Sequence, residues 1–144
     1  MTDSYEFDRF VAAQDAGGTY ARALDELRAG QKTSHWMWFV FPQLAGLGRS
    51  ATAQRYAISS LDEARAYLEH PILGPRLRES ASALLDVADR SAEEILGGID
   101  AIQLRSSMTL FEQADPSRPL FGQVLDRYFG GQRDAATLRL LGAG

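Results

Sequence analysis

The chain has 144 residues, a length typical of one domain, and 45% of them are hydrophobic, so it can bury a core without metals or disulfides. Its formal net charge of −4 argues against general nucleic-acid binding, which needs a positive field. The absence of cysteine excludes a disulfide framework, a thiol nucleophile and a thiolate metal site. The start is acidic and no apolar run nears the ~20 residues that span a bilayer, so we expect a cytoplasmic protein without membrane contact.

In the first third of the chain, helical spacing alternates with glycine and proline stops. Apolar residues predict a short first helix that ends near residues 17–18, then a second helix capped by Thr19 and ended by Gly30. Residues 35–41 have the composition of a strand, but no partner strand is evident. A short helix ending before Pro42 is therefore an equal alternative.

The rest of the chain is marked by residues that start helices. The expected caps or first positions are Ser50, Ser60, Pro75, Ser91, Asp100 and Asp134. Two of these serines stand three residues before a glutamate, the capping-box pattern in which side chains and amides bond reciprocally. Helical spacing nearly throughout predicts an all-α protein, a single compact domain over residues 1–144 with about seven or eight short helices.

The most unusual stretch is residues 32–50, which holds both tryptophans, one of the two histidines and the only lysine. An aromatic wall with a few convergent polar groups describes a small-molecule site. It also describes an ordinary core with a satisfied histidine. The candidate ligand-binding residues of this stretch are Lys32, Trp36, Trp38, Gln43, Gly48, Arg49 and Ser50.

His35 is the candidate catalytic residue, because imidazole suits proton transfer near neutral pH. The alternative is a histidine hydrogen-bonded to backbone beside a core. No metal site is expected, since His70 lies far along the chain and nothing specifies carboxylate ligands. Lys32 can reach an anion near the aromatic segment, or can merely complement the dipole of the helix before it.

The loop at residues 46–50 has the composition of an anion site. Its two glycines allow close approach of backbone to a ligand, Arg49 offers a fork of donors, and Ser50 begins a helix with unpaired amides. It lacks the dinucleotide fingerprint and is no Walker loop. A plain turn with a capping serine is the simpler interpretation.

Three hydroxyl residues, Ser106, Ser107 and Thr109, lie within one predicted helix, with Arg105 and Gln103 alongside. Such residues are mediocre in helix interiors, so either close packing or a hydroxyl row facing a pocket explains them. We favour packing for Ser107. Arg105, Ser106 and Thr109 complete the candidate ligand-binding set.

Residues 32–50 resemble the opening signature of an uncharacterised family, the domain of unknown function 1810 (DUF1810). The similarity continues through residues 55–58, 63–77, 100–111 and 129–134, and covers nearly the whole chain. It implies a single, mostly helical domain and carries no established activity. The family often has lysine at the position of Gln103, so an anion-binding lysine would here be replaced by a neutral donor.

A shorter stretch, residues 70–84, is similar to the NADAR group, which is linked to ADP-ribose derivatives. The sequence thus predicts a cytoplasmic protein with a small-molecule pocket that binds or processes a nucleotide or ADP-ribose-type ligand. The alternatives are a non-catalytic protein-interaction module that uses the aromatic 35–43 segment, or aromatic residues that simply fill the core. The sequence indicates no particular cofactor, reaction type or oligomeric state.

Overall fold

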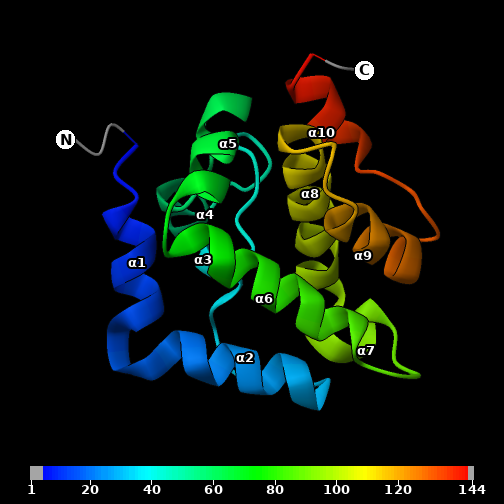
Figure 1. Cartoon of the computed structure of the whole chain (residues 1–144). Coiled ribbons are helices and arrows are strands. Elements are labelled where there is room, and N and C mark those ends of the chain that lie inside the picture. Colours follow the sequence, from blue (N-terminus) through cyan, green and yellow to red (C-terminus); the bar gives the residue numbers. More distant parts are fainter. Residues whose placement is uncertain (1–4, 143–144) are drawn as a thin grey trace.

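The computed structural model describes residues 5–142 and is all-α over that range, as the sequence predicts (Figure 1). No helix among these residues is long and apolar enough to cross a membrane. An isolated parallel bridge joins Leu44 to Ile58. The helices are α1 (Asp8–Asp15), η1 (Ala16–Gly18, a 3-10 turn), α2 (Thr19–Ala29), α3 (Met37–Val40), α4 (Ala51–Arg55), α5 (Leu61–Glu69), α6 (Leu73–Leu85), α7 (Ala92–Leu96), α8 (Gly98–Ala114), α9 (Leu120–Phe129) and α10 (Ala135–Leu140).

Helix α8 is the centre of the fold, since it packs against α5, α7, α9 and α10. Figure 1 shows α8 upright beside α9, with α10 above α8 and α2 along the bottom of the view. A chain of rings crosses the core from α1 to α9. The ring centroids of Phe10 and Tyr67 lie 5.2 Å apart, those of Tyr67 and Phe111 5.3 Å, and those of Phe111 and Phe121 5.9 Å. All four side chains are fully buried, so this ring chain joins four helices into one core.

Several predicted caps are confirmed. Ser50 and Asp134 accept hydrogen bonds from backbone amides in the first turns of α4 and α10. Ser91 and Glu94 form the complete capping box of α7. The other predicted box is half formed, because the carboxylate of Glu63 bonds to the amide and hydroxyl of Ser59 instead of returning to the cap residue.

Two predicted helix starts are wrong by a few residues. Gly18, in the left-handed conformation, takes the N-cap position of α2, and the Thr19 hydroxyl donates to the Ala16 carbonyl at 2.6 Å. Pro75 is the third residue of α6, which begins at Leu73. Proline is tolerated in the first turn, because the amides there have no intrahelical acceptor.

The start of α8 also differs from the prediction. Asp100 does not cap this helix; it lies in the first turn, after an N-cap at Gly97 without a side-chain bond. Its carboxylate instead contacts Lys32, with Nζ and Oδ2 3.0 Å apart. An acidic residue near the start of a helix can cap the helix, or it can pair with a cation that is distant in the sequence. The local sequence is the same in both cases, so it does not distinguish a cap from an ion-pair partner.

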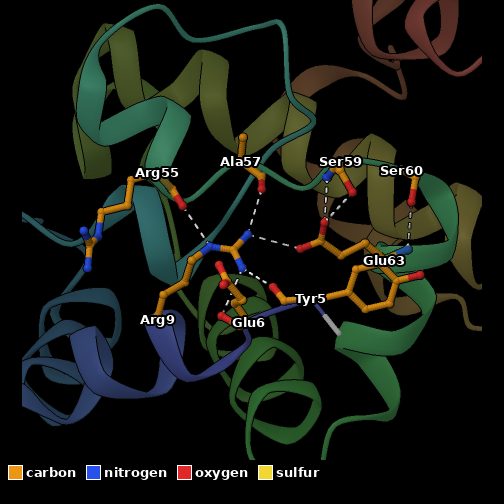
Figure 2. Close-up of polar contacts among 8 residues, drawn as sticks. All are labelled: Tyr5, Glu6, Arg9, Arg55, Ala57, Ser59, Ser60 and Glu63. Carbon is orange, nitrogen blue, oxygen red and sulfur yellow. Dashed lines mark hydrogen bonds and ion pairs between the residues drawn. The ribbon is translucent and has the colours of Figure 1, made fainter. Parts of the chain in front are cut away.

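Arg9 fastens α1 to the segment between α4 and α5 (Figure 2). Its guanidinium has five N–H donors, and all of them find acceptors. The acceptors are the carbonyls of Tyr5, Glu6, Arg55 and Ala57 and the carboxylate of Glu63. The Glu63 side chain is only 3% exposed, so this ion pair is largely screened from water. The clamped segment continues into the bridge at Ile58, which supports the residues that follow α3.

Candidate functional site

Glu26, near the end of α2, holds the segment that leads into α3. One carboxylate oxygen, Oε1, accepts from the amides of Thr33 at 2.7 Å and Ser34 at 3.0 Å, and from Trp36 Nε1 at 2.9 Å. The other oxygen accepts from the Ser34 hydroxyl at 2.6 Å. Burial acts to raise the pKa of Glu26, but the hydrogen bonds from Ser34, Thr33 and Trp36 outweigh it and hold the pKa at about 2. A permanent carboxylate therefore fixes the aromatic segment in place.

The two tryptophans have different environments. Trp36 is fully buried, with its indole N–H on Glu26 and its ring near Phe41, so it lies in the core and not in the wall of a cavity. Trp38 is only half-buried and packs against the edge of the core. Of the two candidate rings, only Trp38 is open to a ligand.

A cavity of about 460 Å³ opens beside Trp38, and we call it the Gln43 hollow. It is formed where α3, the 46–50 loop, α8 and the start of α10 meet. Its apolar wall consists of Trp38, Leu47, Ile99 and Ile102, and its polar groups belong to Gln43, Arg49, Ser50, Gln103, Ser106 and Asp134. Gly48 also lines the hollow, whose lining residues thus come from distant parts of the sequence.

Three polar residues of the hollow, Gln43, Gln103 and Ser106, are linked by hydrogen bonds to one another or to α3. Ser106 Oγ lies 2.7 Å from Gln43 Oε1 and 3.0 Å from the Gln103 carbonyl. The Gln103 amide nitrogen donates to the carbonyls of Met37 and Phe41, at 3.1 and 2.9 Å. The Gln103 amide nitrogen thus satisfies two backbone carbonyls, and neither of its N–H groups is left for a ligand.

The 46–50 loop forms one rim of the hollow. A Cβ on Gly48 would lie 2.5 Å from Ala53 Cβ, so glycine is needed for the loop to pack on α4. Ser50 Oγ accepts from the Ala53 amide at 3.0 Å and so caps α4, which is a single short turn. This agrees with the simpler interpretation of the loop, a plain turn with a capping serine. Arg49 is exposed, and its guanidinium makes no ion pair or hydrogen bond with the described residues.

A second cavity of about 440 Å³, the Lys32 hollow, shares two lining residues, Trp38 and Ile99, with the Gln43 hollow. It is lined by Lys32, His35 and Asp100, among others. Lys32 is paired with Asp100, and its side chain is 10% exposed. His35 is exposed, and its ring makes no hydrogen bond within the described part of the chain. The candidate base is therefore near Lys32, and does not line the cavity that holds Gln43, Arg49 and Ser106.

Arg105 and Thr109 hold the chain before α10 and do not line either hollow. Arg105 donates to the Arg133 carbonyl at 3.0 Å. The Thr109 hydroxyl donates to the Arg105 carbonyl at 2.8 Å and accepts from the Asp134 amide at 2.9 Å. Ser107 is fully buried, in agreement with a packing role.

Residues 70–84 have structural roles. His70 Nδ1 accepts from the amides of Ile72 and Leu73 and so caps α6, while Leu77 and Leu84 are buried in the core. None of these residues lines either hollow. Within the described residues, no group of three or more His, Cys, Asp or Glu side chains could hold a metal ion.

Sequence reasoning missed several residues of this region. Ile99 and Ile102, in the first turns of α8, are 85% and 67% exposed. The sequence does not reveal this, because an apolar residue in a helix is usually expected to be buried. Glu26 reads as an ordinary helix acid, because nothing in its spacing reveals the four donors around it. Asp134 was expected as a cap, which it is, but it also lines the Gln43 hollow.

The described residues thus form an all-α domain that carries the Gln43 and Lys32 hollows. Residues 4–141 match the model of a protein family of unknown function, DUF1810, and the chain belongs to that family. The fold matches the crystal structure of the conserved hypothetical protein Rv1873 from Mycobacterium tuberculosis with a TM-score of 0.94. The two are 50% identical, over 99% of this chain and 100% of that one. A comparison with curated proteins gives no match.

Proposed function

We propose that this protein binds a small molecule of the nucleotide or ADP-ribose type in the Gln43 hollow. The observation that carries the proposal is the convergence of Trp38, Gln43, Arg49 and Ser106 on one cavity, although Ser106 is far from the others in sequence. A volume of about 460 Å³ falls in the range of small-molecule sites. An apolar wall with a few convergent polar groups is the usual construction of such sites.

The proposed ligand has a planar ring and an anionic group. The ring packs against the half-buried indole of Trp38, because aromatic faces gain from both burial and stacking. The anion meets Arg49, whose guanidinium has no carboxylate partner among the described residues and offers the bidentate fork that suits phosphate. The helix after Ser50 adds little, since its first turn is already capped.

Binding is the part of the function that this arrangement supports best. His35 lines the Lys32 hollow and not the Gln43 hollow, although the two cavities share Trp38 and Ile99. A catalytic role for His35 thus requires a ligand that extends from the Gln43 hollow into the Lys32 hollow.

The test is calorimetric titration and thermal unfolding with ADP-ribose, adenosine 5′-monophosphate and inorganic phosphate. A ligand at one hundred times its dissociation constant stabilises the fold by about 2.7 kcal/mol. Trp38→Leu and Arg49→Gln are each expected to weaken binding by about tenfold, the equivalent of about 1.4 kcal/mol. Arg65→Gln removes an exposed arginine that lies outside the hollow and is the charge-matched control. The proposal fails if no nucleotide binds at millimolar concentration, or if Arg49→Gln and Arg65→Gln behave alike.

A second candidate is a non-catalytic protein-interaction module. The exposure of Ile99 and Ile102 beside Trp38 favours it, because neighbouring exposed apolar side chains mark interaction surfaces. The 35–43 segment itself is mostly buried and contributes only a small part of that face. Concentration-dependent association in sedimentation equilibrium that Ile99→Ser with Ile102→Ser abolishes, together with an inert nucleotide panel, would favour this candidate over the first.

A further inference from the structure

The ion pair of Lys32 and Asp100 has hydrogen-bonding capacity that the described residues do not fill. Lys32 Nζ lies 3.0 Å from Asp100 Oδ2 and 5.2 Å from the centroid of the Trp36 ring. Among the described residues, Nζ has no other acceptor, and no group donates a hydrogen bond to Asp100 Oδ1. An ammonium has three donors and a carboxylate accepts several hydrogen bonds, so the pair retains both donors and acceptors.

This remaining capacity lies at a cavity with an apolar wall. Both residues of the pair line the Lys32 hollow, and the side chains of Lys32 and Asp100 are only 10% and 25% exposed. Met37, Trp38 and Leu96 supply the apolar part of the lining. Polar groups without partners are unfavourable in such surroundings, so the hollow favours an occupant that both donates and accepts hydrogen bonds.

The two hollows differ in their charge. The Lys32 cation is balanced by Asp100, whereas the guanidinium of Arg49 in the Gln43 hollow has no carboxylate partner among the described residues. His35 also lines the Lys32 hollow, but it is exposed, so water screens any charge on its ring. An anion beside Lys32 would also lie near the carboxylate of Asp100, which repels it. The anionic part of a ligand is therefore expected at Arg49, and an uncharged polar part at the ion pair.

We propose that the Lys32 hollow binds the 2′- and 3′-hydroxyls of the ribose that carries the ring of the ligand. This inference rests on the proposed function, which places the ring against Trp38 and the anion at Arg49. Trp38 and Ile99 line both hollows, so one ligand can contact both. The uncharged polar groups of a nucleotide outside its ring are mainly the ribose hydroxyls. Two adjacent hydroxyls can donate to Asp100 Oδ1 and accept from Lys32 Nζ at the same time.

Replacement of both members of the ion pair removes the proposed contacts without leaving a buried charge unpaired. In the variant Lys32→Met with Asp100→Leu, apolar side chains take the place of the pair, a change that proteins often tolerate. The matched control is Arg65→Met with Asp62→Leu. That pair is exposed, lines neither hollow, and has its acid in the first turn of α5, as Asp100 is in the first turn of α8.

The experiment compares adenosine 5′-monophosphate with 2′,3′-dideoxyadenosine 5′-monophosphate, which has the same ring and phosphate but lacks both hydroxyls. Dissociation constants are measured by calorimetry for the wild type and the two double variants. We expect the wild type and the control to bind adenosine monophosphate about tenfold more tightly than the dideoxy ligand. The variant of the Lys32 hollow is expected to bind both ligands equally. A merely structural role of the ion pair would instead weaken both ligands by the same factor and preserve the preference.

The wild-type comparison needs no substitution, so it decides the matter even if the variant of the Lys32 hollow does not fold. Equal binding of the two ligands by the wild type would mean that the hydroxyls do not use the ion pair, and would overturn the inference alone. A preference that survives Lys32→Met with Asp100→Leu, or binding of ADP-ribose without binding of either monophosphate, would do the same. Failure of all three ligands to bind would overturn both the inference and the proposed function.

Discussion

Glu26→Gln is the substitution that tests the support of the site most directly. The carboxylate accepts hydrogen bonds from four donors, all in residues 33–36 that lead into α3, and Glu26 is 8% exposed. Its pKa falls from an ordinary 4.5 to about 2 on folding. Since one pKa unit corresponds to 1.36 kcal/mol, the ionised form contributes on the order of 3 kcal/mol to stability at neutral pH.

The sign of the pH dependence follows from the depressed pKa. A carboxyl that is more acidic in the folded protein stabilises it fully above pH 4.5, and that contribution is lost as the pH falls toward 2. Glutamine retains an acceptor but has no charge to lose. Glu26→Gln should therefore be less stable than the wild type by about 2–3 kcal/mol at pH 7, and the difference should shrink by about 2 kcal/mol at pH 3.

The assay is urea unfolding of the wild type, Glu26→Gln and the surface control Glu69→Gln, from pH 7 to pH 3. Substitutions at exposed positions usually change stability by no more than about 0.5 kcal/mol, so Glu69→Gln is expected to match the wild type. The reasoning is refuted if Glu26→Gln is as stable as Glu69→Gln at pH 7, or if its deficit is the same at pH 3 as at pH 7.

Three further predictions concern the Arg9 contacts, the 46–50 loop and His35. Arg9→Ala should cost about 3–5 kcal/mol in urea unfolding, because it leaves Glu63 buried without a cation. Gly48→Ala should cost about 1–3 kcal/mol, and should also weaken nucleotide binding in calorimetry, because the new methyl group would overlap Ala53. His35→Ala should change unfolding free energy by less than about 0.5 kcal/mol, since the side chain is exposed and makes no hydrogen bond to a described residue.

Controls for these substitutions are available in the same chain. Arg65→Ala removes an exposed arginine from a 3.4 Å pair with Asp62, and should cost no more than about 1 kcal/mol. If Arg9→Ala lowers the free energy of unfolding no more than Arg65→Ala does, the Arg9 contacts do not stabilise the fold. An unchanged Gly48→Ala protein would mean that the loop accommodates the methyl group, and a large loss for His35→Ala would assign this histidine a structural role.

Local signals predicted most of the fold. Ser91 with Glu94 specifies its capping box within four residues, and Gly30 ends α2 in the left-handed conformation that glycine favours. The start at Asp100 was wrong, because an acid in a first turn looks the same as a cap in the sequence. Only the long-range partner Lys32 distinguishes the two, and that partner is 3.0 Å away in space but far away in the chain.

The candidate site was predictable only in its location. The 32–50 stretch does contain Trp38, Gln43 and Arg49, which line the hollow. Which tryptophan faces the cavity depends on how one turn of helix is seated on the core, and α3 is too short for a hydrophobic periodicity to reveal this. The contact of Ser106 with Gln43 spans 63 residues, so no local spacing could have predicted it.

The most direct test of ligand binding in the Gln43 hollow uses the two indole N–H resonances of the chain in a ¹H–¹⁵N correlation spectrum. Trp38→Phe assigns the two signals. On titration with ADP-ribose, the Trp38 signal should shift saturably, whereas the Trp36 signal should stay in place because that N–H is buried on Glu26. A Trp38 signal that does not move with adenosine monophosphate or ADP-ribose at millimolar concentration would contradict the account.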